Sequence, residues 1–122
     1  LVVEDNDLNM EIAEFMLRDL GAEVKKAWNG QEAVDRFKNS EPGEYDVILM
    51  DIMMPVLNGL DAARKIRRLD REDVGTIPII AMSANAFSED IASSLEAGMN
   101  AHISKPINTE KLIKMLNQYC RR

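Results

Sequence analysis

The residues best suited to chemistry are three carboxylates, a hydroxyl and an ammonium group, each at or just after the end of a short apolar run. Glu4 and Asp5 end the first run, Asp51 the third and Ser83 the fourth, and Lys105 follows the fifth. In an open parallel sheet, ligands bind beyond the carboxyl ends of the strands, where the strand order reverses. If these runs are parallel strands, the five groups converge there.

Carboxylates brought together repel one another, and burying one such charge without compensation is costly or forces a raised pKa. A cation is therefore expected. Oxygen ligands completed by water suit Mg²⁺, and no His or Cys stands at these strand ends to favour zinc. With the charge shielded, Asp51 is the natural nucleophile toward a phosphoryl donor, while Lys105 and Ser83 would hold the phosphoryl oxygens.

The elements that must position these groups alternate strand-like apolar runs with stretches of helical period, which is typical of a parallel sheet covered by helices on both faces. The expected strands are 1–4, 23–27, 47–51, 79–83 and 101–104. Five helices are expected between and after the strands. The first has Leu8, Ile12, Phe15, Met16 and Leu20 at helical spacing and ends at Gly21, and the next two cover 30–39 and 59–69. The fourth runs from the cap Ser88 to Gly98, and the fifth is capped by Asn108.

Five such units in 122 residues, without an internal repeat, predict one α/β domain with a doubly wound, five-stranded parallel sheet. The commonest strand order at this size is the flavodoxin-like 2-1-3-4-5, which places strands one and three side by side. Because residue 1 already lies inside an expected strand, we expect residues 1–122 to be a domain of a longer protein.

Charge and composition exclude several classes. Fifteen basic against twenty-one acidic residues give a net charge of -6, which opposes binding to nucleic acid or anionic lipid. Cys120 is the single cysteine, and no run approaches the ~20 apolar residues of a membrane span. A cytoplasmic domain without membrane contact is expected.

Four motifs stand at the ends of the first, third, fourth and fifth expected strands: VEDN at 3–6, MDIMMP at 50–55 followed by Asn58-Gly59, AMSA at 81–84 and SKP at 104–106. In this order they resemble the receiver domain of bacterial two-component response regulators, and the resemblance covers essentially the whole chain. The resemblance implies that Asp51 accepts a phosphoryl group from a phosphohistidine of a histidine kinase or phosphotransfer domain. It further implies that Glu4, Asp5, Asp51 and the main-chain carbonyl of Met53 hold Mg²⁺.

By the same resemblance, Lys105 pairs with the phosphoryl oxygens and Ser83 moves toward them, which signals phosphorylation to the outer surface. His102 stands where the family usually has a rotating Phe or Tyr, so its part in the switch is open. The helix from Ser88, the strand 101–104 and the last helix form the family's usual partner face, which would also serve a homodimer.

Two other functions on related sheets fit less well. Aspartyl phosphatases resembling haloacid dehalogenases have a second Asp two residues after the nucleophile, where this chain has Met53. Slow self-dephosphorylation, with Met53 and Asn85 beside the site, is expected instead of rapid turnover. A flavodoxin-like FMN carrier needs hydroxyl and glycine donors after strand one, whereas this chain has acids that would repel phosphate.

The motifs most resemble receivers of hybrid sensor histidine kinases. The alternatives are the receiver of a DNA-binding or stand-alone regulator and, less consistent with the residues, an unphosphorylated scaffold.

Three other features have structural interpretations: core packing by methionines such as Met10, Met16, Met50 and Met115, surface packing by Trp28, and a solvated basic face formed by Arg64, Lys65, Arg67, Arg68 and Arg71.

Overall fold

Five parallel strands form one sheet in the computed structural model, which describes residues 1–41, 44–52, 57–69, 77–83, 88–104 and 108–119, without the side chains of 88–91 and 104. The strand order is β2-β1-β3-β4-β5, as predicted. The strands are β1 (Val2–Val3), β2 (Lys26–Ala27), β3 (Ile48–Asp51), β4 (Ile79–Ser83) and β5 (Ala101–Ser104).

The first three strands are shorter than expected, although backbone bonds continue beyond their ends. The Glu4 N–H donates to the Ala27 carbonyl at 3.1 Å, and the Val2 N–H donates to Lys25 at 2.9 Å. Apolar composition predicts where a chain is extended, whereas the ladder needs a partner in register on the neighbouring strand. The residues beside the strand ends are therefore extended, but they are not part of the strands because their pairing with the neighbouring strand is incomplete.

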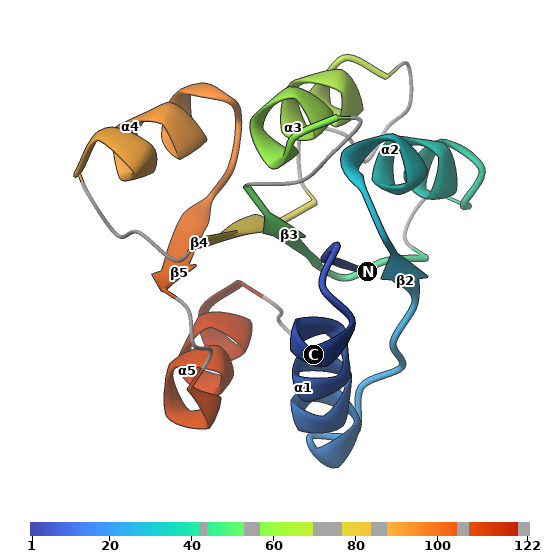
Figure 1. The fold of residues 1–122 in the computed structure, drawn as a ribbon, viewed down its shortest axis with the longest axis vertical. Helices are drawn as coiled ribbons and strands as arrows, with labels where there is room; N and C mark the ends of the chain where they lie inside the picture. The colour runs from blue at the N-terminus through green and yellow to red at the C-terminus, as the bar shows by residue number, and fades with distance from the viewer. Residues whose placement is uncertain (42–43, 53–56, 70–76, 84–87, 105–107, 120–122) are drawn as a thin grey trace.

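Helices cover both faces of the sheet (Figure 1), with α2, α3 and α4 on one face and α1 and α5 on the other. Their bounds are α1 (Asp7–Asp19), α2 (Gly30–Lys38), α3 (Gly59–Arg67), α4 (Ser88–Glu96) and α5 (Thr109–Tyr119). Three predicted ends are present: Gly21 and Gly98 adopt φ of 88° and 97°, and the Asn108 side chain accepts the Glu110 N–H at 2.9 Å. The α2 and α3 helices end at Lys38 and Arg67, slightly before the predicted residues 39 and 69, and the predicted cap Ser88 is the first residue of α4. In the part of the chain that the structure describes, no helix is long and apolar enough to span a membrane.

Alternate strand residues supply two cores, one on each face, because successive side chains of a strand point to opposite sides. Val3, Met50 and Ala81 pack with α2 and α3 around the fully buried Phe37. The neighbouring positions pack with α1 and α5, and they include Val2, Leu49, Ile80, Met82 and Ile103. The methionines predicted as core occupy these layers: Met10 and Met50 are buried, and Met16 and Met115 pack against them.

The apolar series that predicted α1 lies mainly on the solvent side of that helix. Met10, Ala13 and Leu17 are its buried residues. Leu8 is 64% exposed and Phe15 73%, and Ile12 and Leu20 are also exposed. Both sets have helical spacing, so the periodicity located the helix, and only packing against the sheet selected the buried side.

One residue of the predicted basic face is not solvated. The half-buried Arg67 donates from Nε to the Gly98 carbonyl at 2.9 Å and from Nη2 to Asn100 Oδ1 at 2.8 Å. Burial lowers the pKa of Arg67. The position of α4 and β5 beside the end of α3 gives this guanidinium acceptors that helical spacing does not reveal. Arg71 lies outside the described residues.

Candidate functional site

The pairing of β1 with β3 brings the predicted carboxylates together. Val3 is in register with Met50, so Glu4 and Asp51 follow at the same edge of the sheet. One ligand oxygen from each of Glu4, Asp5 and Asp51 lies within 4.8 Å of the other two. Glu4 is 1% exposed and Asp51 4%, whereas Asp5 faces solvent. The three residues form an acidic cluster that is buried on one side and open on the other.

The start of α1 orients Glu4. The Asn6 N–H donates to Glu4 Oε1 at 3.2 Å, and the Asn6 side chain caps α1 by accepting the Asn9 N–H at 3.0 Å. A helix N-terminus carries partial positive charge, which stabilises a nearby anion. Asn6 therefore links the helix to the acidic cluster.

The backbone after Asp51 is closely packed. The Ile52 N–H donates to the Met82 carbonyl at 3.0 Å, and the Gly59 N–H donates to the Ile52 carbonyl at 2.9 Å. A Cβ on Gly59 would lie 2.2 Å from the Asp51 carbonyl oxygen. Only glycine fits there, so the start of α3 lies directly against the residue that carries the carboxylate.

Ser83 lies at the same edge of the sheet, on the strand next to β3. Asp51 is in register with Met82, and Ser83 follows, 5% exposed. His102 is half-buried in the middle of β5, opposite Ala81. Three other predicted residues, Met53, Asn85 and Lys105, lie outside the described residues.

The donor set of the acidic cluster consists of carboxylate oxygens alone. Hard cations prefer such ligands, and Mg²⁺ in particular takes one or two carboxylates and keeps several waters. The exposed side at Asp5 leaves room for water. The chemistry of the cluster therefore fits the predicted ion.

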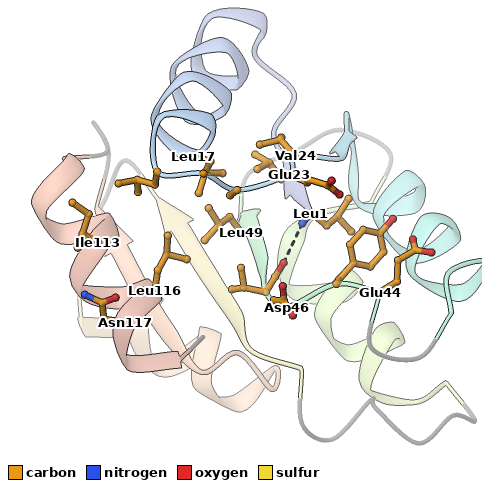
Figure 2. A pocket seen from close by; sticks show the side chains of 16 residues that line it. Leu1, Leu17, Glu23, Val24, Glu44, Asp46, Leu49, Ile113, Leu116 and Asn117 are labelled. Atoms are coloured by element: carbon orange, nitrogen blue, oxygen red, sulfur yellow. Dashed lines mark hydrogen bonds between the residues drawn. The ribbon is translucent and has the colours of Figure 1, made fainter. Parts of the chain in front are cut away.

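A separate hollow of about 750 Å³ lies at the amino-terminal edge of the sheet (Figure 2). Leu17, Leu49 and Leu116 are among its lining residues, and the Leu1 amino group donates to the Val47 carbonyl at 3.1 Å beside it. Among the residues that the structure describes, none of the predicted site residues lines it. This hollow is therefore separate from the acidic cluster, which lies at the carboxyl-terminal edge of the sheet.

Residues 1–117 match the family described as the response regulator receiver domain. The chain belongs to this family. The receiver is 43% identical, over 98% of its length, to the osmosensing histidine protein kinase SLN1 of Saccharomyces cerevisiae. It is 39% identical over 99% of its length to hybrid signal transduction histidine kinase I of Dictyostelium discoideum, and 39% over 98% to the sensor protein ArcB of Escherichia coli.

The receiver spans only 7%, 10% and 15% of the lengths of the Dictyostelium, yeast and E. coli relatives. These similarities confirm the predicted likeness to receivers of hybrid histidine kinases.

Two solved structures extend the comparison. The receiver domain of the sensor histidine kinase PA1611 from Pseudomonas aeruginosa has a TM-score of 0.86 and 39% identity, covering 98% of this chain and 93% of that one. It was crystallised with a magnesium ion coordinated in the active site cleft. The Ssk1 receiver of S. cerevisiae, solved with the histidine phosphotransfer protein Ypd1, has a TM-score of 0.85 and 32% identity. The match covers 98% of this chain and 86% of that one.

Sequence reasoning missed one feature beside the site, the exposed apolar side of α1. Leu8 lies three residues after Asp5, and Ile12 and Phe15 continue along the helix. The available signal was a helix with more apolar residues than one buried face requires. We name Leu8, Ile12 and Phe15 the α1 face.

Proposed function

We propose that this receiver accepts a phosphoryl group on Asp51 from a phosphohistidine, with Mg²⁺ in the acidic cluster. The observation that carries the proposal is the convergence of Glu4, Asp5 and Asp51 within 4.8 Å, with two of them buried. A bound cation would offset the mutual repulsion of these carboxylates, and a phosphoryl group needs its charge neutralised to approach a carboxylate.

Glu4, Asp5 and Asp51 would hold the ion, and the carbonyl of Met53 is the predicted further ligand. Mg²⁺, when bound, offsets the negative charge of the carboxylates and of the incoming phosphoryl oxygens. The magnesium found in the similar PA1611 receiver supports this assignment.

In the transfer step, a carboxylate oxygen of Asp51 forms a bond to phosphorus as the bond from phosphorus to the donor imidazole nitrogen breaks. The electron pair of the broken bond stays on that nitrogen, which leaves as imidazole. Asp51 is fixed for this attack by the backbone packing of Ile52 and Gly59. Ser83 and Lys105 then bind the phosphoryl oxygens, whose additional charge favours the state with both contacts.

The phosphorylated state should persist, because the position two residues after Asp51 is Met53, which has no carboxylate to activate water. The domain is thus a switch rather than a metabolic enzyme. Ser83 reports phosphorylation, and His102 on the neighbouring strand is the candidate to pass the change to the surface of β5.

The donor protein docks on the α1 face. Phosphotransfer requires the donor's histidine to reach Asp51, so the donor must cover the surface around the open side of the acidic cluster. Leu8, Ile12 and Phe15 begin directly beside it and expose apolar area that this chain does not bury. A histidine kinase or phosphotransfer domain with an apolar helix surface fits, as the solved pair of Ypd1 with the similar Ssk1 receiver illustrates for that system.

We place the domain in a phosphorelay as the receiver of a hybrid histidine kinase. Its likeness over nearly its whole length to segments of much longer histidine kinases supports this role. The homodimer through α4, β5 and α5 stays a prediction.

Intact mass spectrometry after brief incubation with acetyl phosphate and Mg²⁺ tests the proposal. One phosphoryl adduct is expected, lost with a chelator and lost in Asp51→Asn. No adduct on a folded protein that binds Mg²⁺ would refute phosphoacceptor function and favour the scaffold alternative.

A further inference from the structure

The first residue of α2 contacts the connection that follows Asp51. The Gly30 N–H donates to the Leu57 carbonyl at 3.0 Å. The first N–H groups of a helix have no partner inside it and need an acceptor from elsewhere. Leu57 supplies that acceptor, and it lies two residues before Gly59, where α3 begins.

The contact admits no side chain at position 30. A Cβ there would lie 2.1 Å from the Leu57 oxygen and 3.1 Å from the Cβ of Ala62. The nearer atom belongs to the backbone, so the main chain itself would have to move. Gly30 is buried at the start of α2, and α2 packs against α3 on one face of the sheet (Figure 1).

Both partners in this contact are otherwise held firmly. Asn29 caps α2 by accepting the Glu32 N–H at 2.9 Å and donating to Glu32 Oε2 at 3.2 Å. Asn58 caps α3 in the same way, accepting the Asp61 N–H at 2.9 Å. The end of the connection at Leu57 therefore lies between two capped helix starts.

The other end of the connection is held by the second close glycine contact. Gly59 donates to the Ile52 carbonyl, and its missing Cβ leaves room for Asp51. Ile52 is thus held by the start of α3, and Leu57 is held by the start of α2.

We infer that Gly30 is a positioning residue for phosphoryl transfer, acting through the Leu57 carbonyl on the backbone that leaves Asp51. This inference rests on the proposed function of Asp51. A side chain at Gly30 displaces Leu57 and, through Asn58 and Gly59, the start of α3 that lies against the backbone of Asp51, although Gly30 itself belongs to another helix.

The variant Gly30→Ala tests the inference, and Gly21→Ala is its control. Gly21 has φ of 88° and open space around its Cβ position, so its substitution strains only the backbone at the opposite end of α1 from the site. For folded Gly30→Ala we expect Mg²⁺ affinity to fall about 10-fold. At saturating Mg²⁺ we expect phosphorylation by acetyl phosphate to slow by about 10- to 100-fold. Gly21→Ala should keep both wild-type values despite lower stability. Wild-type values in folded Gly30→Ala would overturn the inference.

A titration of the wild-type protein covers the case in which Gly30→Ala does not fold. In amide NMR spectra, Mg²⁺ alone should shift the Gly30 signal in step with that of Asp5, and leave the Gly21 signal in place. A stationary Gly30 signal would overturn the inference. Failure of the wild type to become phosphorylated would instead refute the proposed function, while this titration would still report on the contact between Gly30 and Leu57.

Discussion

Arg67 and Asn100 join the end of α3 to the beginning of β5 through a hydrogen bond of 2.8 Å from guanidinium to amide oxygen. The same Asn100 oxygen accepts the Ile79 N–H at 2.9 Å, and the Asn100 carbonyl accepts the Tyr119 hydroxyl at 3.2 Å. Asn100 therefore links α3, β4, β5 and α5 at the edge of the sheet opposite the acidic cluster.

Removal of this link should destabilise the fold. We expect Arg67→Ala to lower the free energy of unfolding by about 1–2 kcal/mol, because the half-buried Gly98 carbonyl and the exposed Asn100 amide oxygen lose a charged donor. Arg64→Ala on the same helix is the matched control. The side chain of its partner Asp61 is about half exposed, so the loss should stay below about 0.5 kcal/mol. In urea unfolding, equal losses for the two variants would contradict a special role for Arg67.

The acidic cluster should oppose folding when no divalent cation is bound. We expect Asp51→Asn to raise the free energy of unfolding by about 1 kcal/mol in a chelator, since it removes one of three repelling charges. Glu23→Gln, which removes an exposed carboxylate at the other edge of the sheet, is the control and should have little effect.

Mg²⁺ should reverse this order of stability. At about 100 times its Kd, the ion should raise the free energy of unfolding of the wild type by about 2.7 kcal/mol, and chelation should remove the gain. Thermal unfolding with and without Mg²⁺ measures it. The same gain in Asp51→Asn as in the wild type would show that the ion binds elsewhere.

The α1 face should matter for a protein donor more than for a small one. Phe15→Ser should slow transfer from a phosphorylated histidine phosphotransfer domain by about 10-fold, the cost of about 1.4 kcal/mol of lost docking energy. The change with acetyl phosphate should be much smaller. Leu95→Ser on α4, at 56% exposure, is the control. If Leu95→Ser slowed transfer as much as Phe15→Ser, the donor would dock elsewhere.

Ionisation of Tyr45 should lower the free energy of unfolding at alkaline pH. Burial of its phenol, together with the charge of Glu44, raises the pKa of Tyr45 above its ordinary value of 10.0, and the ring stacks on Phe37. The folded state thus favours the neutral phenol. Its contribution is complete below about pH 10 and is lost as the pH rises through the folded pKa, because the unfolded chain ionises first.

Tyr45→Phe should therefore remove part of the alkaline fall in stability. Urea unfolding of both proteins from pH 8 to 11 measures the difference, which isolates the phenol from the lysines common to both chains. Parallel curves over this range would show that the Tyr45 phenol ionises equally in the folded and unfolded states.

Much of this receiver was determined by local sequence. Apolar runs alternating with helical periods predict the five strands and helices, and caps such as Gly21, Gly98 and Asn108 fix helix ends through interactions within a few residues. The strand order then brings Glu4 and Asp51 to one edge, so the acidic cluster was predictable once the strands were placed.

Tertiary structure alone decided which groups are buried and what they touch. Leu8 and Phe15 have the same helical spacing as Met10 and Leu17, and only contact with the sheet left the first pair in solvent. Arg67 appeared to be one charge on a solvated face until packing brought it acceptors thirty-one and thirty-three residues away in sequence. Gly30 likewise meets Leu57 only in the folded chain. Spacing encodes local geometry, whereas burial and long-range bonds depend on the packing of the whole domain.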